Sequence, residues 1–418
     1  MSRIARHPAA ESALLTLAAL ILLVVGIGRP ATMYYDEGYW LPEARAFVQG
    51  TPNPHPIVSP LVRPPLGKLM VAAGMELAGD NAFGWRIAGA VCGALTVGGV
   101  YLWTYLLLFD RRLALLAGGL TLLDNFVFVM SRIAMLDIFF VFYLVWSLVA
   151  FTAAVSLKTG AAARRGLLIG SGILIGLAGA CKWNAIDTLG AYFLVGAALL
   201  WLAYRPSSEI ESPLRRYAGN IRQIGAPTLL LGLSAVPLAA YALTYWPMCR
   251  LLRQPFGIRS LVAMNFAVWH FSVTEVSNKF LVTPWYQWPF SLKPQMGLSY
   301  LVANPVVAWG GIAALLVCMW SFLKKRELAE GFVILLFAAN FLQWVVTPEK
   351  GLLYYYYFPC VVILGAAIAV ALRNLPARFL GIRVSLAILA CAFLVFLWCY
   401  PRMAHLDAPW DCVFGCWS

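Results

Sequence analysis

Long apolar runs recur along almost the whole chain, and they constrain its fold more than any other feature. A helix that crosses a bilayer needs about 20 mostly apolar residues, because the hydrocarbon core is about 30 Å thick and each residue rises about 1.5 Å. Windows of that length predict about eleven membrane-spanning helices. The predicted spans are 11–29, 86–108, 114–130, 136–157, 166–181, 185–203, 227–246, 301–323, 330–347, 352–371 and 383–400.

The composition supports this interpretation. Hydrophobic residues make up 62% of the chain, charged residues only 12%, and the mean hydropathy is +0.78. A water-soluble globule with these values would expose far too much apolar surface. We therefore expect an all-α polytopic membrane protein in which residues 1–418 form a single integral membrane domain.

The basic residues indicate the orientation of the chain in the membrane. The net charge is +13, but the Lys and Arg residues lie in short clusters in every second connection between spans, so the charge reflects topology rather than nucleic-acid binding. Cytoplasmic loops are enriched in Lys and Arg, which predicts a multi-pass protein of the cell inner (plasma) membrane with a cytoplasmic N-terminus. One alternative is that the first span is a cleaved signal peptide. The clusters are Arg3/Arg6, Arg111/Arg112, Lys158/Arg164/Arg165, Arg205/Arg215/Arg216/Arg222, Lys324/Lys325/Arg326 and Arg373/Arg378/Arg383.

An acidic pair, Asp36-Glu37, follows directly after the first apolar run. Only 18 of the 418 residues are acidic, so two adjacent carboxylates at a membrane surface suggest catalysis. On the predicted topology the pair faces outward, in the first of two long outer connections, residues 30–85 and 247–300. Both connections are rich in Pro and aromatic residues, and we expect them to form short helices on the membrane surface.

Ionisable residues within or beside the spans are further candidates. A charge near the centre of a span costs about 2.5 to 3.5 kcal/mol on insertion scales, so each one is a functional hypothesis. Arg86, Asp124, Asp137 and Lys182 are all predicted near the outer interface, where they could join the first outer connection in one polar cavity. The alternative is that Asp124 and Asp137 are structural partners of Arg132 or Lys182.

Arg63 and Lys68 enclose the stiff segment Pro64-Pro65-Leu66-Gly67 in the first outer connection. A planar guanidinium fork beside a compact ammonium suits a phosphate group. The alternative is a turn at the membrane surface whose cations extend toward water.

The second outer connection contains His270 and, further on, Trp285, Gln287 and Trp288. Aromatic belts explain one or two such residues at an interface. The additional His and Gln favour a wall for a sugar or a lipid head group.

The chemistry that fits these residues is sugar transfer from a polyprenyl phosphate. The sequence has no Walker-type or dinucleotide-type Gly pattern, and no Cys or His spacing typical of a zinc site. When the leaving group is a phosphate, cations can stabilise its charge, and a single carboxylate suffices as the base that takes the proton of an acceptor hydroxyl. One displacement would invert the anomeric centre, unlike the two-carboxylate retaining hydrolases.

Seven stretches, in order along the chain, resemble the protein O-mannosyltransferase family, in its compact bacterial form. The resemblance implies a GT-C fold with two extracytoplasmic loops, a polyprenyl-phosphate mannose donor and an acceptor Ser or Thr of a secreted protein. We expect no required cofactor, and the need for a divalent metal stays open. The matching stretches are Asp36-Glu37, Arg63-Pro64-Pro65-Leu66-Gly67-Lys68, Trp85-Arg86-Ile87-Ala88-Gly89, Ser131-Arg132-Ile133-Ala134-Met135-Leu136-Asp137, Lys182-Trp183, Trp285-Tyr286-Gln287-Trp288-Pro289 and Tyr355-Tyr356-Tyr357-Phe358-Pro359.

The resemblance also implies roles for individual residues. Asp36 would be the base, and Glu37 would orient it or bind the acceptor. The donor phosphate would be bound by Arg86 and Arg132, with secondary contributions from Lys68, Lys182 and Arg63, although family members commonly have His at the position of Arg63. Apart from these roles, we expect the sugar or acceptor pocket to contain His55, Asp137, His270, Trp285, Gln287, Trp288 and Tyr356.

Two alternative functions remain open at this stage. Within the same class, the enzyme could transfer a pentose or an amino sugar to a lipid or envelope polysaccharide, as aminoarabinose transferases do. From another class, the chain could be a transporter or flippase of lipid-linked sugars, but transporters often place charges near the bilayer midplane and show a repeat between halves. The partners expected from the preferred interpretation are membrane lipid, the polyprenyl-phosphate sugar and an acceptor protein or glycan, without nucleic acid.

Overall fold

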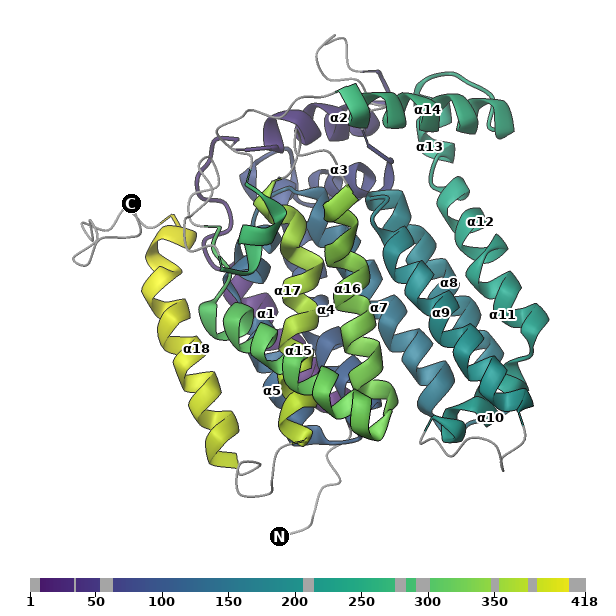
Figure 1. Cartoon of the computed structure of the whole chain (residues 1–418). Coiled ribbons are helices and arrows are strands. Elements are labelled where there is room, and N and C mark those ends of the chain that lie inside the picture. The colour runs from purple at the N-terminus through teal and green to yellow at the C-terminus, as the bar shows by residue number, and fades with distance from the viewer. Residues whose placement is uncertain are drawn as a thin grey trace.

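The fold is known from a computed structural model and is helical. The structure describes residues 8–33, 35–52, 63–205, 214–274, 283–290, 301–346, 353–374 and 382–405. Within these ranges the long helices run side by side and form a bundle, with shorter helices across one end (Figure 1). The predicted site residue His55 lies outside the described residues.

Nine helical segments within the described ranges are long and apolar enough to cross a membrane. Each overlaps one of the predicted spans. They are α4 (Ala82–Leu108), α7 (Leu136–Ser156), α8 (Ala161–Cys181), α9 (Ala185–Tyr204), the segment formed by α11 (Ala226–Leu233), α12 (Ala235–Leu243) and α13 (Trp246–Leu251), then α15 (Pro305–Lys325), α16 (Leu328–Val346), η3 (Tyr354–Tyr357) with α17 (Phe358–Arg373), and α18 (Ile382–Met403).

Two predicted spans differ from a straight membrane-spanning helix. The third consists of α5 (Arg111–Leu122) and α6 (Asn125–Ser131), which meet at an angle of 56° and form at most a tenth, broken span. The break lies at Asp124, whose Oδ1 accepts hydrogen bonds from the backbone N–H groups of Phe126 (2.8 Å) and Val127 (3.4 Å) and so caps α6. The first predicted span is α1 (Pro8–Val24), which has only 17 residues.

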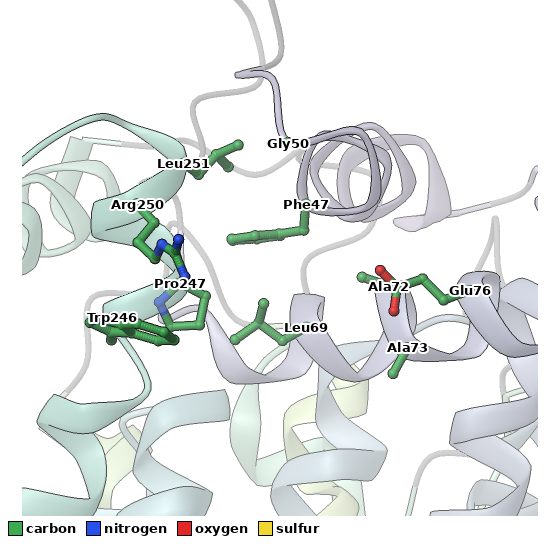
Figure 2. A pocket seen from close by; sticks show the side chains of 10 residues that line it. All are labelled: Phe47, Gly50, Leu69, Ala72, Ala73, Glu76, Trp246, Pro247, Arg250 and Leu251. Atoms are coloured by element: carbon green, nitrogen blue, oxygen red, sulfur yellow. The ribbon is translucent and has the colours of Figure 1, made fainter.

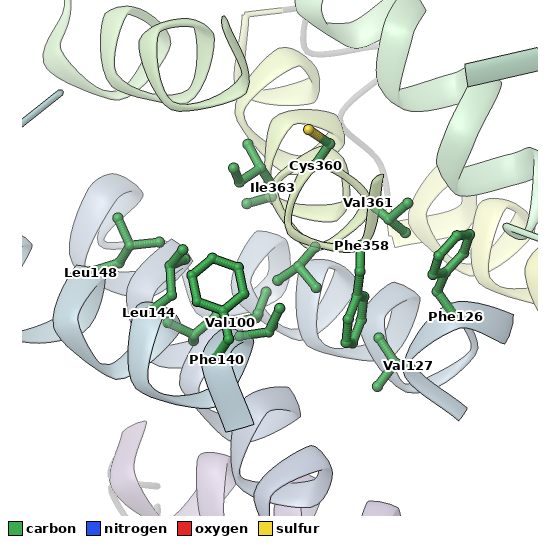
Figure 3. Close-up of a cluster of buried hydrophobic side chains, with 14 of the residues drawn as sticks. Val100, Phe126, Val127, Phe140, Leu144, Leu148, Phe358, Cys360, Val361 and Ile363 are labelled. Atoms are coloured by element: carbon green, nitrogen blue, oxygen red, sulfur yellow. The ribbon is translucent and has the colours of Figure 1, made fainter. Parts of the chain in front are cut away.

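The centre of the bundle is α17. In its most apolar stretch 94% of the residues are buried, compared with 17% in α18. Figure 3 shows how the core is built: Phe140, Leu144 and Leu148 of α7 face Ile363 and other side chains of α17. Helix α18 lies at the edge of the bundle (Figure 1) and exposes a wide apolar surface, as expected of a lipid-facing helix.

Helix α8 packs closely against α11 and α12 through two glycines spaced four residues apart. A Cβ atom at Gly172 would lie 2.1 Å from the carbonyl oxygen of Gly232, and one at Gly176 would lie 2.3 Å from that of Pro237. Small residues at this spacing let two membrane helices approach at backbone distance.

Short helices from the two predicted outer connections lie at the same end of the bundle. The first connection contains α2 (Glu37–Gln49) and α3 (Leu66–Ala78), and the second contains α14 (Ile258–Thr274) and η1 (Trp285–Phe290). Figure 1 shows α2 and α14 across the top of the bundle, whereas α10 (Arg215–Ile224) lies at the opposite end. This arrangement brings the acidic pair near one end of the long helices.

Candidate active site

Asp36 stands at the start of α2 and takes the N-cap position. The chain reaches it through a tight turn in which Tyr35 has φ 55°, a conformation uncommon for a residue with a side chain. The backbone N–H of Tyr39 donates to the Asp36 carbonyl oxygen at 2.9 Å. The turn separates the two acidic side chains: Asp36 is partly exposed, whereas Glu37 is fully buried.

Residues from five segments converge around the Asp36 carboxylate. Asp137 lies in the first turn of α7, and Lys182 lies at the C-terminal end of α8; the Lys182 Nζ donates to Asp137 Oδ1 at 2.6 Å. The Tyr355 hydroxyl lies 3.5 Å from Asp36 Oδ2, and the charges of Arg63, Asp137 and Lys182 all act on Asp36. Of the four charges predicted to converge with the first outer connection, Asp137 and Lys182 lie in this cluster as an ion pair. Arg86 is paired with Glu37 and Asp124 caps α6, so these two do not join it.

Aromatic rings line the same cluster. The Lys182 ammonium lies 4.0 Å from the ring centroid of Tyr356 and 5.1 Å from that of Tyr355, an attractive cation–π arrangement. The ring of Tyr35 meets that of Tyr355 edge to face, with centroids 5.8 Å apart. Tyr356 is one of the predicted pocket residues, whereas Tyr35 and Tyr355 are not. The sequence signal for Tyr35 is its place beside the acidic pair, and that for Tyr355 is its place in the Tyr run before α17.

The electrostatic environment gives Asp36 the properties of a base. Burial, and then the negative charge of Asp137, raise the pKa of Asp36 from 3.8 to about 6. The cations Arg63 and Lys182 and the hydrogen bond from Tyr355 act in the opposite direction. A carboxylate whose pKa lies close to neutral pH accepts a proton more readily than an ordinary aspartate and is still ionised at pH 7.

Helix α14 covers one side of the cluster. The Arg63 Nη1 donates to the Ser272 hydroxyl at 3.3 Å, and Phe271 packs against Trp40 of α2 and Leu136 of α7. The second outer connection therefore contacts both the helix that begins at the acidic pair and the predicted phosphate-binding Arg63.

Glu37 and Arg86 form a buried ion pair, which corrects two predicted roles. Both side chains are 0% exposed, and Arg86 Nε and Nη2 donate to the two Glu37 carboxylate oxygens at 2.7 and 2.8 Å. Arg86 also donates to the carbonyl oxygens of Ile27, Pro30 and Thr32. These contacts occupy all five N–H groups of the guanidinium, so Arg86 cannot bind a donor phosphate in this arrangement, and the buried Glu37 cannot reach an acceptor.

Arg132 and Lys68 also lie apart from the open cluster. Arg132 is 5% exposed, and its Nη1 donates to the carbonyl oxygens of Leu23 (2.7 Å) and Val25 (2.6 Å) at the end of α1. Lys68 is fully buried in α3, and burial lowers its pKa to about 8 although the charge of Glu43 acts against this change. The structure therefore uses Arg132 to hold the first helix, and it places Lys68 beneath the surface.

The aromatic residues of the second outer connection do not form one wall. Trp288 is fully buried, with its ring 5.5 Å from that of Trp344, and its Nε1 donates to the Thr283 carbonyl oxygen; it is a core residue, contrary to the prediction. Trp285 is partly buried against Phe341, with ring centroids 5.4 Å apart. The remaining two predicted side chains are exposed: His270 on α14 and Gln287 on η1.

The described residues include no group of three or more His, Cys, Asp or Glu side chains placed to hold a metal ion. The Asp36 cluster itself combines two carboxylates, two cations and three tyrosines. This set can accept a proton at Asp36 and attract an anionic group at Arg63 and Lys182.

Sequence comparisons find similarity to protein mannosyltransferases. Residues 63–252 match the family model described as dolichyl-phosphate-mannose-protein mannosyltransferase (PMT). The chain is 25% identical to the polyprenol-phosphate-mannose–protein mannosyltransferase of Mycobacterium tuberculosis, over 94% of this chain and 88% of the relative.

Solved structures show the same fold. The Saccharomyces cerevisiae protein O-mannosyltransferase Pmt1–Pmt2 complex matches with a TM-score of 0.77 at 13% identity, over 94% of this chain and 89% of that chain. ArnT from Cupriavidus metallidurans, bound to undecaprenyl phosphate, matches with a TM-score of 0.63 at 19% identity, over 90% of this chain and 63% of that chain. The fold is therefore the GT-C fold, and residues 63–252 of the chain match the PMT family of mannosyltransferases.

Proposed function

We propose that this protein transfers mannose from a polyprenyl-phosphate mannose donor to a Ser or Thr hydroxyl of proteins. The match of residues 63–252 to the PMT family model and the similarity to the mycobacterial enzyme over most of both chains support the donor and the acceptor. The observation that carries the proposal is the placement of Asp36, whose pKa of about 6 suits a base, beside Arg63 and Lys182.

The proposed reaction is a single displacement. Asp36 accepts the proton of the acceptor hydroxyl while that oxygen attacks the anomeric carbon, and the bond from that carbon to the phosphate oxygen breaks on the opposite face. The configuration at the anomeric carbon is therefore inverted. Lys182 donates one N–H to Asp137 and has two more for the leaving phosphate, and Arg63 adds a second positive charge.

The two buried arginines then have positioning roles. Arg86 holds the turn before α2 through Glu37 and three backbone carbonyls, and Arg132 holds the end of α1. Both contacts fix the segment that carries Asp36. We place this segment on the extracytoplasmic side and the N-terminus in the cytoplasm, because the basic clusters alternate between the connections.

The test is reconstitution of the purified protein in liposomes with polyprenyl-phosphate mannose and a Thr-containing peptide, with the product identified by mass spectrometry. Asp36→Asn should lower kcat by about 10² to 10⁴-fold, the usual contribution of a general base. The matched control is Asp80→Asn, which changes an acidic residue paired with Arg45 near the end of α3 and should leave kcat unchanged. Normal turnover by Asp36→Asn would contradict the assignment of the base.

The same assay separates the alternative functions. The wild-type protein is offered a polyprenyl-phosphate amino sugar with a lipid acceptor, because ArnT shares the fold. Transfer of that sugar in place of mannose would overturn the proposed substrates but not the enzyme class. Movement of the mannose lipid between leaflets without a glycopeptide product would indicate a flippase.

A further inference from the structure

A cavity lies apart from the Asp36 cluster, between α2, α3 and α13. Its volume is about 470 Å³, within the range of pockets that hold small ligands. Figure 2 shows Phe47 of α2 projecting into it above Leu69 of α3, with Trp246 of α13 opposite. We call this cavity the α2–α3–α13 groove.

The groove combines apolar surface with charges of both signs. The aromatic side chains of Phe47 and Trp246 provide the apolar part. Glu76 and Arg250 line opposite sides (Figure 2), and both residues are exposed. A polypeptide fits such a surface well, because it offers apolar side chains together with positive and negative ones. A phospholipid with an anionic head group fits it less well, since Glu76 repels negative charge.

Helix α2 connects the groove to the Asp36 cluster. It begins directly after Asp36, and Phe47 lies ten residues beyond Glu37. At about 1.5 Å per residue, the groove therefore starts about 15 Å from the base. An extended polypeptide covers this distance with about four or five residues, since each spans about 3.3 Å.

Helix α14 independently links the same two places. Near its middle, Met264 packs with Met248 of α13 in a cluster that Phe47 joins. Near its C-terminal end, Ser272 bonds to Arg63 of the Asp36 cluster. These two positions are eight residues apart, or about 12 Å along the helix, so α2 and α14 both run from the groove to the base.

We propose that the α2–α3–α13 groove binds the acceptor polypeptide about four or five residues from the Ser or Thr that receives the sugar. An apolar acceptor side chain would pack between Phe47 and Trp246, and charged neighbours would face Glu76 or Arg250. This inference rests on the proposed function. It adds a docking site for the acceptor that lies outside the reacting residues.

The experiment compares two acceptor peptides with Ala73→Trp, a variant that fills the groove. Ala73 is exposed and lines the cavity, so a larger side chain there leaves the core unchanged. One peptide has 15 residues with a central Thr, and the other has only two residues on each side of it. The matched control is Leu77→Trp, on the same helix at a position 88% exposed and outside the groove lining.

Ala73→Trp should raise the KM of the long peptide about fivefold or more, the effect of losing one important contact of about 1 kcal/mol. It should leave kcat and the KM of the short peptide unchanged, which also shows that the variant is folded. Leu77→Trp should change neither the kcat nor the KM of either peptide. Arg250→Glu should change the KM of long peptides in opposite directions according to the charge of the flanking residues.

Three results would overturn the inference. Unchanged kinetics of the long peptide with both Ala73→Trp and Arg250→Glu would show that the groove does not bind the acceptor. If Ala73→Trp lowered the activity equally with both peptides, and this effect depended on the phospholipid composition of the liposomes, the groove would be a lipid site instead. If the wild-type protein transferred mannose to neither peptide, the proposed function itself would fail, and the groove proposal with it.

Discussion

Asp36 and Glu37 are neighbours in the chain but have opposite environments. Successive residues at a helix start point in directions about 100° apart, so one side chain can face the open cluster while the next enters the core. Asp36 meets Asp137, Lys182 and Tyr355, whereas Glu37 is enclosed with Arg86. The two residues therefore have different roles: Asp36 is the proposed base, and Glu37 stabilises the structure that positions it.

The pH dependence of the reaction should report the surroundings of Asp36. Because its pKa is raised to about 6, kcat/KM should fall as the pH drops below about 6 and the base becomes protonated. Asp137→Asn removes a negative charge that raises this pKa, so the acidic limb of the pH–rate profile should move to lower pH. Arg63→Gln removes a cation that lowers it, so the limb should move to higher pH. Shifts in the same direction, measured from pH–rate profiles, would contradict this account.

Thermal unfolding should distinguish the two acidic residues. Glu37→Gln leaves the buried Arg86 charge without its counter-ion, which typically costs about 3 to 5 kcal/mol. Asp36→Asn should not destabilise the protein at pH 7. With a folded pKa raised from 3.8 to about 6, the contribution of Asp36 to stability is present below pH 3.8 and is lost as the pH rises through about 6. Equal melting temperatures of the two variants in detergent would argue against the division of roles.

At the scale of elements, close helix contacts position the site. Helix α8 ends at Lys182, and its packing against α11 and α12 depends on the absence of side chains at Gly172 and Gly176. Any tilt of α8 would move Lys182 away from Asp137 at the start of α7. The contact of α8 with α11 and α12 therefore contributes to the geometry of the cluster from a distance.

The matched variants Gly172→Val and Gly170→Val test this contact. A side chain at Gly172 collides with the Gly232 carbonyl, so the first variant should lose about 1 to 3 kcal/mol of stability, the usual cost of overpacking. Nothing lies within 4 Å of a Cβ at Gly170, so the second should unfold at nearly the wild-type temperature. A similar loss of stability in both variants, measured by thermal unfolding, would show that the helix tolerates valine poorly at any glycine position. The close contact at Gly172 would then not be the cause.

At the scale of the whole molecule, the bundle brings two distant connections to one end. Helices α2, α3 and α14 surround the Asp36 cluster there, and the basic helix α10 lies at the other end (Figure 1). A lipid-linked donor would have its chain along the helices and its phosphate at the cluster. This geometry suits chemistry at a membrane surface between a lipid and a water-soluble polypeptide.

Cysteine labelling tests the proposed orientation. Thr51 follows α2 at the end of the molecule that contains the site, and Gly219 lies on α10; both are exposed. In intact cells, a membrane-impermeant maleimide should label Thr51→Cys, and it should label Gly219→Cys only after permeabilisation, relative to the parent protein with its nine cysteines. The reverse pattern would place the Asp36 cluster in the cytoplasm and contradict the topology.

Several features were predictable from the sequence because they depend on local properties. Hydropathy in 20-residue windows identified the helical segments, and the scarcity of acidic residues singled out Asp36 and Glu37. Hydropathy could not show the break at Asp124 within the third predicted span. One polar side chain that caps a new helix lowers the mean hydropathy of a 20-residue window only slightly. The bend therefore cannot be detected from hydropathy.

What the sequence by itself determined is a membrane bundle of apolar helices with an acidic pair after the first, because bilayer insertion depends on short stretches of chain. The tertiary structure decided which charges share a site. It assigned Arg86 to Glu37, Lys182 to Asp137 and Trp288 to the core, and it created the groove between α2, α3 and α13. The partner of a buried charge depends on which helices pack together, and that is set by contacts between residues far apart in the chain.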